Sequence, residues 1–194
     1  MRLIGLCGRS GSGKSSFCTV ARDCGLTVID CDAVYKCLVS RPTECLKEIG
    51  ECFGNEFIKD GCLDRKALAQ VVFSDKEKLK LLNKVTHKHI RYEIGNILST
   101  LPSDSTVILD APTLFESGID GICDRVVAII APDDFCFKRI TERDGLTEQQ
   151  ALSRLSNQPT NDFLIEHSDT VIYNETTFDE FLKASEDVIK SLKE

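Results

Sequence analysis

The sequence predicts an α/β fold in which helices cover a parallel, five-stranded β-sheet to give three layers. Five short, largely apolar runs alternate with helical segments along the chain. The first three runs stop at a glycine or an aspartate, as buried parallel strands do. Repeated strand–helix units of this kind favour a parallel sheet lying between two layers of helices.

The individual elements follow from apolar periodicity, capping residues and chain breakers. The expected strands are residues 3–7, 26–29, 106–109, 125–130 and 170–173. The expected helices are residues 14–23, 33–38, 65–72, a long segment after 77, a segment from about 134 to 143, and segments after 147 and 177. Helix caps are expected at Asp64, Ser74-x-x-Glu77, Thr147-x-x-Gln150 and Thr177-x-x-Glu180. Gly25 and Gly145 are expected where helices end.

Residues 41–101 differ from the rest of the chain. Helical signals dominate there, and no long apolar strand interrupts them apart from a turn at 59–62 that is typical of a small hairpin. We therefore expect one domain over 1–194. Its core is residues 1–40 and 102–194, and residues from about 41 to 101 form a helical insertion over one edge of the sheet.

Composition and charge exclude several classes of protein. The formal net charge of −7 argues against general affinity for nucleic acid. No apolar run approaches the roughly 20 residues that a membrane-spanning helix needs. The first residues lead directly into a glycine-rich segment and leave no room for a secretory signal. We expect a cytoplasmic protein that is a monomer or a weak homo-oligomer and has no nucleic-acid or membrane partner.

The cysteines are concentrated near the N-terminus, with eight of the ten in the first 62 residues. They form no C-x-x-C pair, and no histidine lies near them in sequence to complete a zinc pattern. The simpler interpretation is a set of small buried side chains and a few exposed thiols in a reducing compartment. The alternative is redox regulation through Cys7 or Cys31.

A phosphate-binding loop is predicted between the first strand and the first helix. Residues 8–15 match G-x-x-x-x-G-K-S/T in full and lie in the strand–helix context that this P-loop motif requires. Backbone amides of such a loop and the N-terminus of its helix bind phosphates. Lys14 is expected to reach the β- and γ-phosphates of ATP, and Ser15 to bind Mg²⁺. The expected nucleotide contacts are Gly8, Ser10, Gly11, Ser12, Gly13, Lys14, Ser15 and Ser16. The alternative is a purely structural glycine loop.

Two acidic residues follow the second strand. Asp32 lies just past the strand end, where ligands gather in open α/β sheets. A carboxylate there can accept the proton of an attacking hydroxyl, although phosphoryl transfer depends mostly on positioning and charge stabilisation. Asp32 can equally cap the helix that begins at Ala33. Asp30 is the rival carboxylate, and the residues alone leave these interpretations open.

Further candidates lie after later strands. Asp110 ends the third strand and is a candidate for holding Mg²⁺ through a water, the alternative being an ordinary residue at the start of a loop. Arg139 and Arg143 are four residues apart on one helix face, next to a glycine-containing turn. Arginines on a mobile lid there would neutralise the transferring phosphoryl group. A solvated face paired with acidic neighbours is the alternative, and Arg143 is the stronger candidate because it lies nearer the turn.

The combined pattern resembles the dephospho-CoA kinases. The resemblance rests on segments spread over nearly the whole chain in the order of that family. These segments are Gly5–Ser15, Val28–Asp32, Asp60–Arg65 with Leu68, Val72 and Phe73, His87 with Ile90, Asp110–Pro112 with Leu114–Glu116, Arg139, Arg143, Gln158, Asp169 and Asn174. The P-loop alone is unspecific, whereas the Asp30-x-Asp32 pair, the Leu114–Glu116 run and the 61–73 stretch together are specific.

The resemblance implies a nucleoside-kinase-like fold with a helical CoA-binding region and a lid at about 139–150. It implies ATP-dependent phosphorylation of the ribose 3′-hydroxyl of dephospho-CoA. Asp32, Lys14 and Arg143 then become the catalytic candidates, and Arg139 joins the nucleotide site. The implied residues of the substrate site are Asp32, Arg65, His87, Pro112, Leu114, Phe115 and Glu116.

The sequence also departs from the family pattern. Arg9 replaces a usual glycine of the loop, and Lys88 replaces a proline after His87. Smaller departures are Cys31, Thr113 and the Glu175-Thr176 pair. Two other functions remain open at this point: a different small-molecule kinase, similar to uridine kinases, and a nucleotide-binding switch that phosphorylates nothing.

Overall fold

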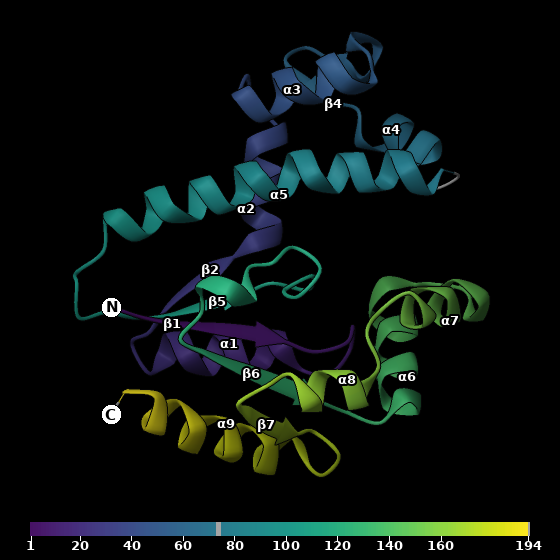
Figure 1. Cartoon of the computed structure of the whole chain (residues 1–194). Helices are drawn as coiled ribbons and strands as arrows, with labels where there is room; N and C mark the ends of the chain where they lie inside the picture. The colour runs from purple at the N-terminus through teal and green to yellow at the C-terminus, as the bar shows by residue number, and fades with distance from the viewer. Residues whose placement is uncertain (73–74, 194) are drawn as a thin grey trace. The chain divides into compact units, whose positions relative to one another are not determined.

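Residues 1–72 and 75–193 are described by the computed structural model of the chain. The chain forms two compact units, whose elements are labelled in Figure 1. One unit consists of Met1–Ile29 and Pro102–Glu194, and we call it the sheet unit. The other consists of Asp30–Leu101, and we call it the helical unit.

The sheet unit contains a five-stranded sheet with the strand order β2-β5-β1-β6-β7. Its strands are β1 (Arg2–Cys7), β2 (Thr27–Asp30, of which Asp30 belongs to the helical unit), β5 (Thr106–Asp110), β6 (Arg125–Ile130) and β7 (Thr170–Tyr173). Its helices are α1 (Lys14–Asp23), α6 (Asp133–Asp144), α7 (Glu148–Ser156), α8 (Asn161–Glu166) and α9 (Phe178–Lys193), with a 3-10 turn η2 (Asp120–Ile122). β1 pairs in parallel with β5 and β6, and β6 pairs in parallel with β7. The loop after β1 therefore leaves the sheet at its centre, where ligands bind in open α/β folds.

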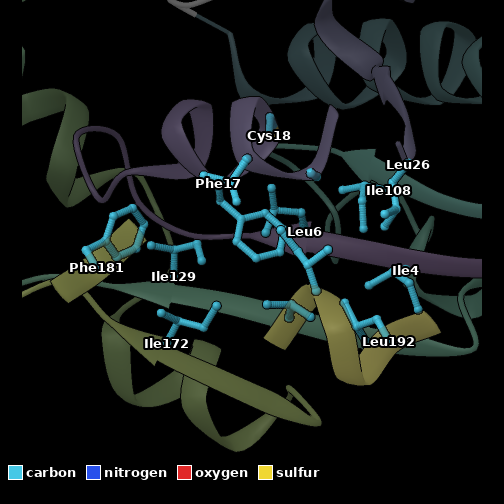
Figure 2. Packing of buried hydrophobic residues seen from close by; sticks show 14 residues of the cluster. Ile4, Leu6, Phe17, Cys18, Leu26, Ile108, Ile129, Ile172, Phe181 and Leu192 are labelled. Atoms are coloured by element: carbon cyan, nitrogen blue, oxygen red, sulfur yellow. The ribbon is translucent and has the colours of Figure 1, made fainter. Parts of the chain in front are cut away.

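One face of the sheet packs against α1 and α9. Phe17 of α1 and Phe181 of α9 are almost fully buried against Leu6, Ile129 and Ile172 of three strands (Figure 2). Because strand side chains alternate between the two faces, the members from β1, Ile4 and Leu6, and those from β6, Val127 and Ile129, are two residues apart. The cluster fixes α1, and with it the loop that precedes α1, on the sheet.

The opposite face is covered within this unit by residues 111–124 and by α8. Gly5 of β1 allows close approach on this side, because an added Cβ would lie 3.0 Å from side-chain atoms of both Leu114 and Cys123. α8 packs on β6. The segment after β5 is thereby held against the strand that leads into the phosphate-binding loop.

α6 and α7 form a helical pair, which we call the arm. Gly145 ends α6 in the left-handed region, with a φ of 62°, and the Thr147/Gln150 capping box begins α7. The two helices share a small core of Ala131, Cys136, Ile140, Ala151 and Leu155. The arm is therefore a packed element with its own apolar contacts.

The helical unit is built from short helices around one long helix. Its elements are α2 (Cys31–Val39), α3 (Glu44–Phe53), η1 (Asn55–Phe57), β3 (Ile58–Lys59), β4 (Cys62–Leu63), α4 (Arg65–Val72) and α5 (Lys76–Ser99). The two short strands pair antiparallel as a hairpin. Glu48 of α3 accepts a bond from Lys88 Nζ at 2.6 Å and lies 2.7 Å from His89 Nε2, both on α5. These contacts fasten α3 to α5.

Most of the predicted elements are confirmed. The five strands, the hairpin and the caps at Asp64, Thr147 and Thr177 are present. Ser74 of the expected capping box lies outside the described residues, and Asp75 caps α5 by accepting from the amides of Glu77 and Lys78. The patterns do not single out α3 or α8. The division of the domain into a core and an insertion of about 41–101 stays a prediction.

Helices of the described ranges, 1–72 and 75–193, include none that combines the length and the apolar character of a membrane span.

Candidate active site

The phosphate-binding loop joins β1 to α1 at the centre of the sheet. Gly11 and Gly13 have φ angles of 82° and 116°, which residues with a Cβ rarely adopt. A Cβ at Gly11 would lie 2.7 Å from the Cys136 carbonyl oxygen, and one at Gly13 would lie 2.5 Å from Asn174 Nδ2. Both the backbone conformation and the close packing of the loop therefore require glycine at these positions.

The loop leaves several backbone amides available to a ligand. Within the part of the chain that the structure describes, the amides of Gly11, Gly13, Lys14 and Ser15 donate to no protein acceptor. The last two belong to the first turn of α1, whose positive end favours anions. A concave run of such amides suits the phosphates of a nucleotide.

Side chains from three distant segments hold the outer side of the loop. Arg139 Nη1 of α6 donates to the Gly11 carbonyl at 3.1 Å, and Asn174 Nδ2 donates to the Ser12 carbonyl at 2.7 Å. Gln158 bonds Ser10 twice: its Oε1 accepts from the Ser10 amide and its Nε2 donates to the Ser10 hydroxyl, each at 3.0 Å. These bonds direct the two carbonyl oxygens toward protein donors.

Lys14 lies at the mouth of this loop. Its Nζ donates to the Gly8 carbonyl at 2.6 Å. Burial lowers the pKa of the Lys14 ammonium, while the Asp110 carboxylate acts in the opposite direction. A partly desolvated ammonium of this kind interacts strongly with a bound phosphate, because few waters screen it.

Asp110 ends β5 beside the loop, in register with Leu6 of β1. Its Oδ2 accepts a bond from Cys18 Sγ of α1 at 3.5 Å, and burial together with this carboxylate raises the pKa of the Cys18 thiol. Ser15 is exposed in the first turn of α1. No cluster of three or more His, Cys, Asp or Glu side chains able to hold a metal occurs among residues 1–72 and 75–193. Two oxygen ligands nevertheless fit Mg²⁺, which keeps several waters.

A small pocket connects the loop with the segment after β5. Its lining includes Gly8 and Arg9 of the loop together with Pro112, Leu114, Phe115 and Glu116. The structure thus brings the implied substrate residues of this segment next to the phosphate-binding loop.

An aromatic group lies beside this pocket. The rings of Phe115 and Phe163 meet edge to face at 5.3 Å between centroids, and the Phe163 and His167 rings stack at 4.0 Å. These contacts hold the Phe115 ring in place on the side of the segment that adjoins α8.

Arg139 and Arg143 of α6 have different surroundings. Arg139 contacts the loop and also donates to Asn174 Oδ1 at 3.4 Å. Arg143 is exposed and forms a two-point contact with Asp144, at 2.7 and 2.9 Å, and Arg154 donates to the same carboxylate at 2.5 Å. The two arginines lower the pKa of Asp144 to about 2. The sequence favours Arg143 over Arg139 because Arg143 lies nearer the turn. In the structure, Arg139 is the one of the two that contacts the phosphate-binding loop.

The cap of α2 settles one question left open by the sequence. Asp30 is the N-cap residue, and its Oδ1 accepts from the Ala33 amide at 3.0 Å. Asp32 is exposed in the first turn and makes no side-chain hydrogen bond within the described residues. The helix begins at Cys31 rather than at Ala33, so of the two alternatives for Asp32 the capping role is excluded, and the Asp32 carboxylate is left available.

The other candidates of the helical unit are less closely held. The Arg65 guanidinium lies over the Tyr35 ring, 5.5 Å from its centroid. His87 is half-buried in α5, where burial and the nearby Arg91 lower the pKa of its imidazole. These residues belong to the helical unit together with Asp32, whereas Lys14, Arg143, Asp110 and the 112–116 segment belong to the sheet unit.

The support of the loop is the part of the site that the sequence reasoning missed. Gln158 and Asn174 enter that reasoning only as points of resemblance, and Arg9 only as a departure. Their positions in the sequence could have identified Gln158 and Asn174 as candidates. Asn174 directly follows β7, and Gln158 follows the last turn of α7. Both lie where polar residues at strand and helix ends meet the edge of the sheet that binds ligands.

The cysteines give no support to redox control at the loop. No disulfide occurs among the described residues, which include all ten cysteines, and both Cys7 and Cys31 are buried. Burial raises the pKa of the Cys7 thiol, which disfavours the reactive thiolate. Among the ten cysteines, all of which the structure describes, the exposed residues are Cys37, Cys52 and Cys62 of the helical unit.

Comparisons with known proteins agree with this geometry. A family model described as dephospho-CoA kinase matches residues 2–180. A dephospho-CoA kinase of Oryza sativa subsp. japonica is 34% identical over 197 aligned residues, which cover 100% of this chain and 86% of the relative. The crystal structure of TT1252 from Thermus thermophilus has a TM-score of 0.86 at 32% identity and covers 98% of this chain and 96% of its own. The dephospho-CoA kinase of Campylobacter jejuni has a TM-score of 0.73 at 28% identity, with 100% and 98% covered.

The family match spans both units and includes the complete phosphate-binding loop, the Asp30-x-Asp32 pair and the pocket residues after β5. The resemblance to the dephospho-CoA kinases predicted from the sequence pattern is therefore confirmed. This chain belongs to the dephospho-CoA kinase family.

Proposed function

We propose that the chain transfers the γ-phosphoryl group of ATP to the ribose 3′-hydroxyl of dephospho-CoA, giving coenzyme A and ADP. The observation that carries this proposal is membership of the dephospho-CoA kinase family over residues 2–180. The complete phosphate-binding loop of the sheet unit supports it. The reaction class is phosphoryl transfer to an alcohol.

The nucleotide side of the reaction is assigned to the loop and the arm. In this proposal the amides of Gly11, Gly13, Lys14 and Ser15 hold the phosphates. The Lys14 ammonium pairs with oxygens of the β- and γ-phosphates. Arg139 supports the loop through its bond to the Gly11 carbonyl. Arg143 exchanges its contact with Asp144 for the transferring phosphoryl group, whose negative charge it stabilises.

The proposed cation is Mg²⁺, held by the Ser15 hydroxyl directly and by Asp110 through a water. When bound, Mg²⁺ would supply positive charge that offsets the negative charge developing on the phosphate during transfer. Ser15 is exposed in the first turn of α1, and the Asp110 carboxylate ends the neighbouring strand. Their oxygens are of the kind that Mg²⁺ prefers.

The acceptor side is assigned to Asp32 and the substrate residues. Asp32 accepts the proton of the 3′-hydroxyl in this proposal, which its exposed and unbonded carboxylate allows. Arg65, His87, Pro112, Leu114, Phe115 and Glu116 are the proposed contacts of dephospho-CoA. The contribution of the base is modest, since the transition state of phosphoryl transfer is loose.

The decisive experiment measures ADP release from ATP with Mg²⁺ in the presence of dephospho-CoA, of uridine, or of no acceptor. We expect release that depends on dephospho-CoA and that forms coenzyme A in equal amount. Stimulation by uridine alone would favour the uridine-kinase-like alternative. Tight nucleotide binding without stimulation by any acceptor would favour the nucleotide switch.

Three further expectations stay predictions: a cytoplasmic location, the lack of a nucleic-acid partner, and a monomeric or weakly associated state. The net charge of −7 supports the second of these. Size-exclusion chromatography with light scattering tests the third.

A further inference from the structure

Arg9 occupies an open position of the loop motif and is buried there. The residue is 7% exposed, although it lies between the two loop residues Gly8 and Ser10. An arginine is rarely buried to this degree unless its charge and its donors are paired. The burial of Arg9 therefore depends on contacts of its side chain, which are distinct from the loop amides proposed to bind phosphate.

The guanidinium contacts both ends of the arm. Nη1 donates to the carboxylate of Asp133, the first residue of α6. Nη2 donates to the carbonyl of Leu155 at 2.6 Å, in the last turn of α7. The Leu155 carbonyl also accepts from the Gln158 amide at 3.2 Å. The negative end of the helix dipole favours a cation at this position.

The arm between these two contacts contains the predicted lid, residues 139–150. α6 leaves the sheet at Asp133, turns at Gly145, and α7 returns to Leu155. One side chain of the loop thus joins the point where the arm begins to the point where it ends. Next to it, the paired bonds of Gln158 to Ser10 fasten the loop to the residues that follow α7.

The charge of Arg9 is already matched within the protein. The carboxylate of Asp133 is its ion-pair partner, and that carboxylate is largely exposed, whereas the guanidinium is not. One buried donor, Nε, has no partner among residues 1–72 and 75–193. Leaving a buried donor unbonded costs stability, which offsets part of what the bonds to Asp133 and Leu155 contribute.

We propose that Arg9 is a positioning residue, which ties the phosphate-binding loop to the base of the arm so that the two are held in one arrangement for nucleotide binding. The proposal rests on the proposed ATP-dependent function of the same loop. It assigns Arg9 no contact with phosphate. Its effect is to hold the loop in its binding conformation before the nucleotide arrives, which lowers the cost of binding.

The two partners of this contact give a test that distinguishes positioning from phosphate binding. If Arg9 positions the loop, Arg9→Met and Asp133→Asn both weaken ATP binding, because each breaks the same link. If Arg9 instead binds phosphate, Asp133→Asn strengthens ATP binding, because it frees a cation beside the loop. The direction of the Asp133→Asn effect decides between the two roles.

The primary measurement is the Kd of ATP with Mg²⁺ by isothermal titration calorimetry, which needs no acceptor. We expect Arg9→Met to raise this Kd about tenfold, as the loss of charged hydrogen bonds implies. Asp133→Asn is expected to raise it less, since Leu155 still accepts from Arg9. The double variant is expected to equal Arg9→Met, because the two residues act through one contact. Arg125→Met, which removes an exposed arginine of the same unit, is the matched control and is expected to leave the Kd unchanged.

Steady-state kinetics supply the second readout. The KM for ATP is expected to rise with the Kd, while the KM for dephospho-CoA stays unchanged, a split that general destabilisation does not produce. Arg9→Lys, which keeps the charge but reaches fewer acceptors, is expected to fall between wild type and Arg9→Met. It also carries the test if Arg9→Met does not fold.

Two outcomes would overturn the proposal. One is an unchanged Kd for ATP in folded Arg9→Met and Arg9→Lys proteins, and the other is tighter binding by Asp133→Asn. Failure of the proposed function is a separate result: the wild-type protein would bind ATP but show no turnover with dephospho-CoA. The calorimetric comparison keeps its meaning in that case.

Discussion

The phosphate-binding loop and the helical unit hold their candidate site residues in different ways. The loop receives side-chain bonds from Arg139, Gln158 and Asn174, which lie more than a hundred residues away in sequence. Asp32 of the helical unit is exposed and makes no side-chain bond within the described residues, and Arg65 contacts one ring. The phosphate-binding loop is therefore held by protein side chains. The Asp32 carboxylate, proposed for the acceptor side, stays available to a ligand.

The largest effect on turnover is expected from Asp32→Asn in the helical unit. The substitution removes the proposed base without changing a contact of the fold, so kcat is expected to fall about 100-fold, at the low end of general-base effects. The Kd of ATP and the thermal stability are expected to stay at their wild-type values. Steady-state kinetics, calorimetry and thermal unfolding measure the three quantities.

Asp30→Asn is the matched control for this substitution. Asparagine is as good an N-cap as aspartate, so α2 keeps its first turn, and kcat is expected to stay close to wild type. Near-normal turnover by Asp32→Asn would remove Asp32 from the role of base. A large loss in Asp30→Asn would transfer that role to Asp30.

Smaller effects are expected when the two arginines of α6 are replaced one at a time. Arg139 supports the loop, whereas Arg143 is proposed to stabilise charge on the transferring phosphoryl group. Arg139→Met removes the donor to the Gly11 carbonyl and is expected to raise the Kd of ATP about tenfold. Arg143→Met leaves the loop intact and is expected to lower kcat about tenfold with little change in this Kd. Calorimetry and initial rates distinguish the two. The same pattern of changes in both variants would contradict the assignment of separate roles.

The smallest effect concerns His87 and the pH dependence of stability. Its folded-state pKa lies below the ordinary value because burial and Arg91 disfavour the imidazolium. The unfolded state then binds more protons, so this histidine lowers stability as the pH falls through about 6.5, its unfolded pKa, toward its folded pKa. Urea unfolding between pH 5 and 8, in the range where the enzyme stays folded, measures the slope.

His87→Gln is expected to reduce that slope, since glutamine does not titrate. Enzyme stability at pH 8, where the imidazole is neutral in both states, changes only by the loss of packing. A slope that is identical in wild type and His87→Gln would contradict the assignment.

Local signals in the sequence predict much of the fold. Glycine at position 145 and the Thr147/Gln150 pair mark the turn of the arm correctly, because the turn and cap chemistry depend on neighbouring residues only. The capping residue of α2 stays open in the sequence, because Asp30 and Asp32 both satisfy the local pattern and only the start of the helix separates them.

Contacts between distant segments account for what the sequence does not predict. Arg139 and Arg143 share a helix face, and nothing in their spacing shows that one contacts the loop while the other pairs with Asp144. The burial of Arg9 depends on Asp133 and Leu155, which are brought to it by the return of the arm. Such arrangements follow from packing and chain topology, which a single sequence does not specify.

The distribution of the thiols offers a way to observe the two units separately. Cys37, Cys52 and Cys62 are exposed and lie in the helical unit, while the cysteines of the sheet unit are buried or, at Cys24 and Cys123, only partly exposed. Burial and nearby acidic residues raise the pKa of Cys123 in the sheet unit to about 12, which slows its alkylation. A maleimide fluorophore therefore labels the helical unit of the wild-type chain preferentially. Energy transfer to a fluorescent nucleotide in the loop then reports the distance between the units in solution.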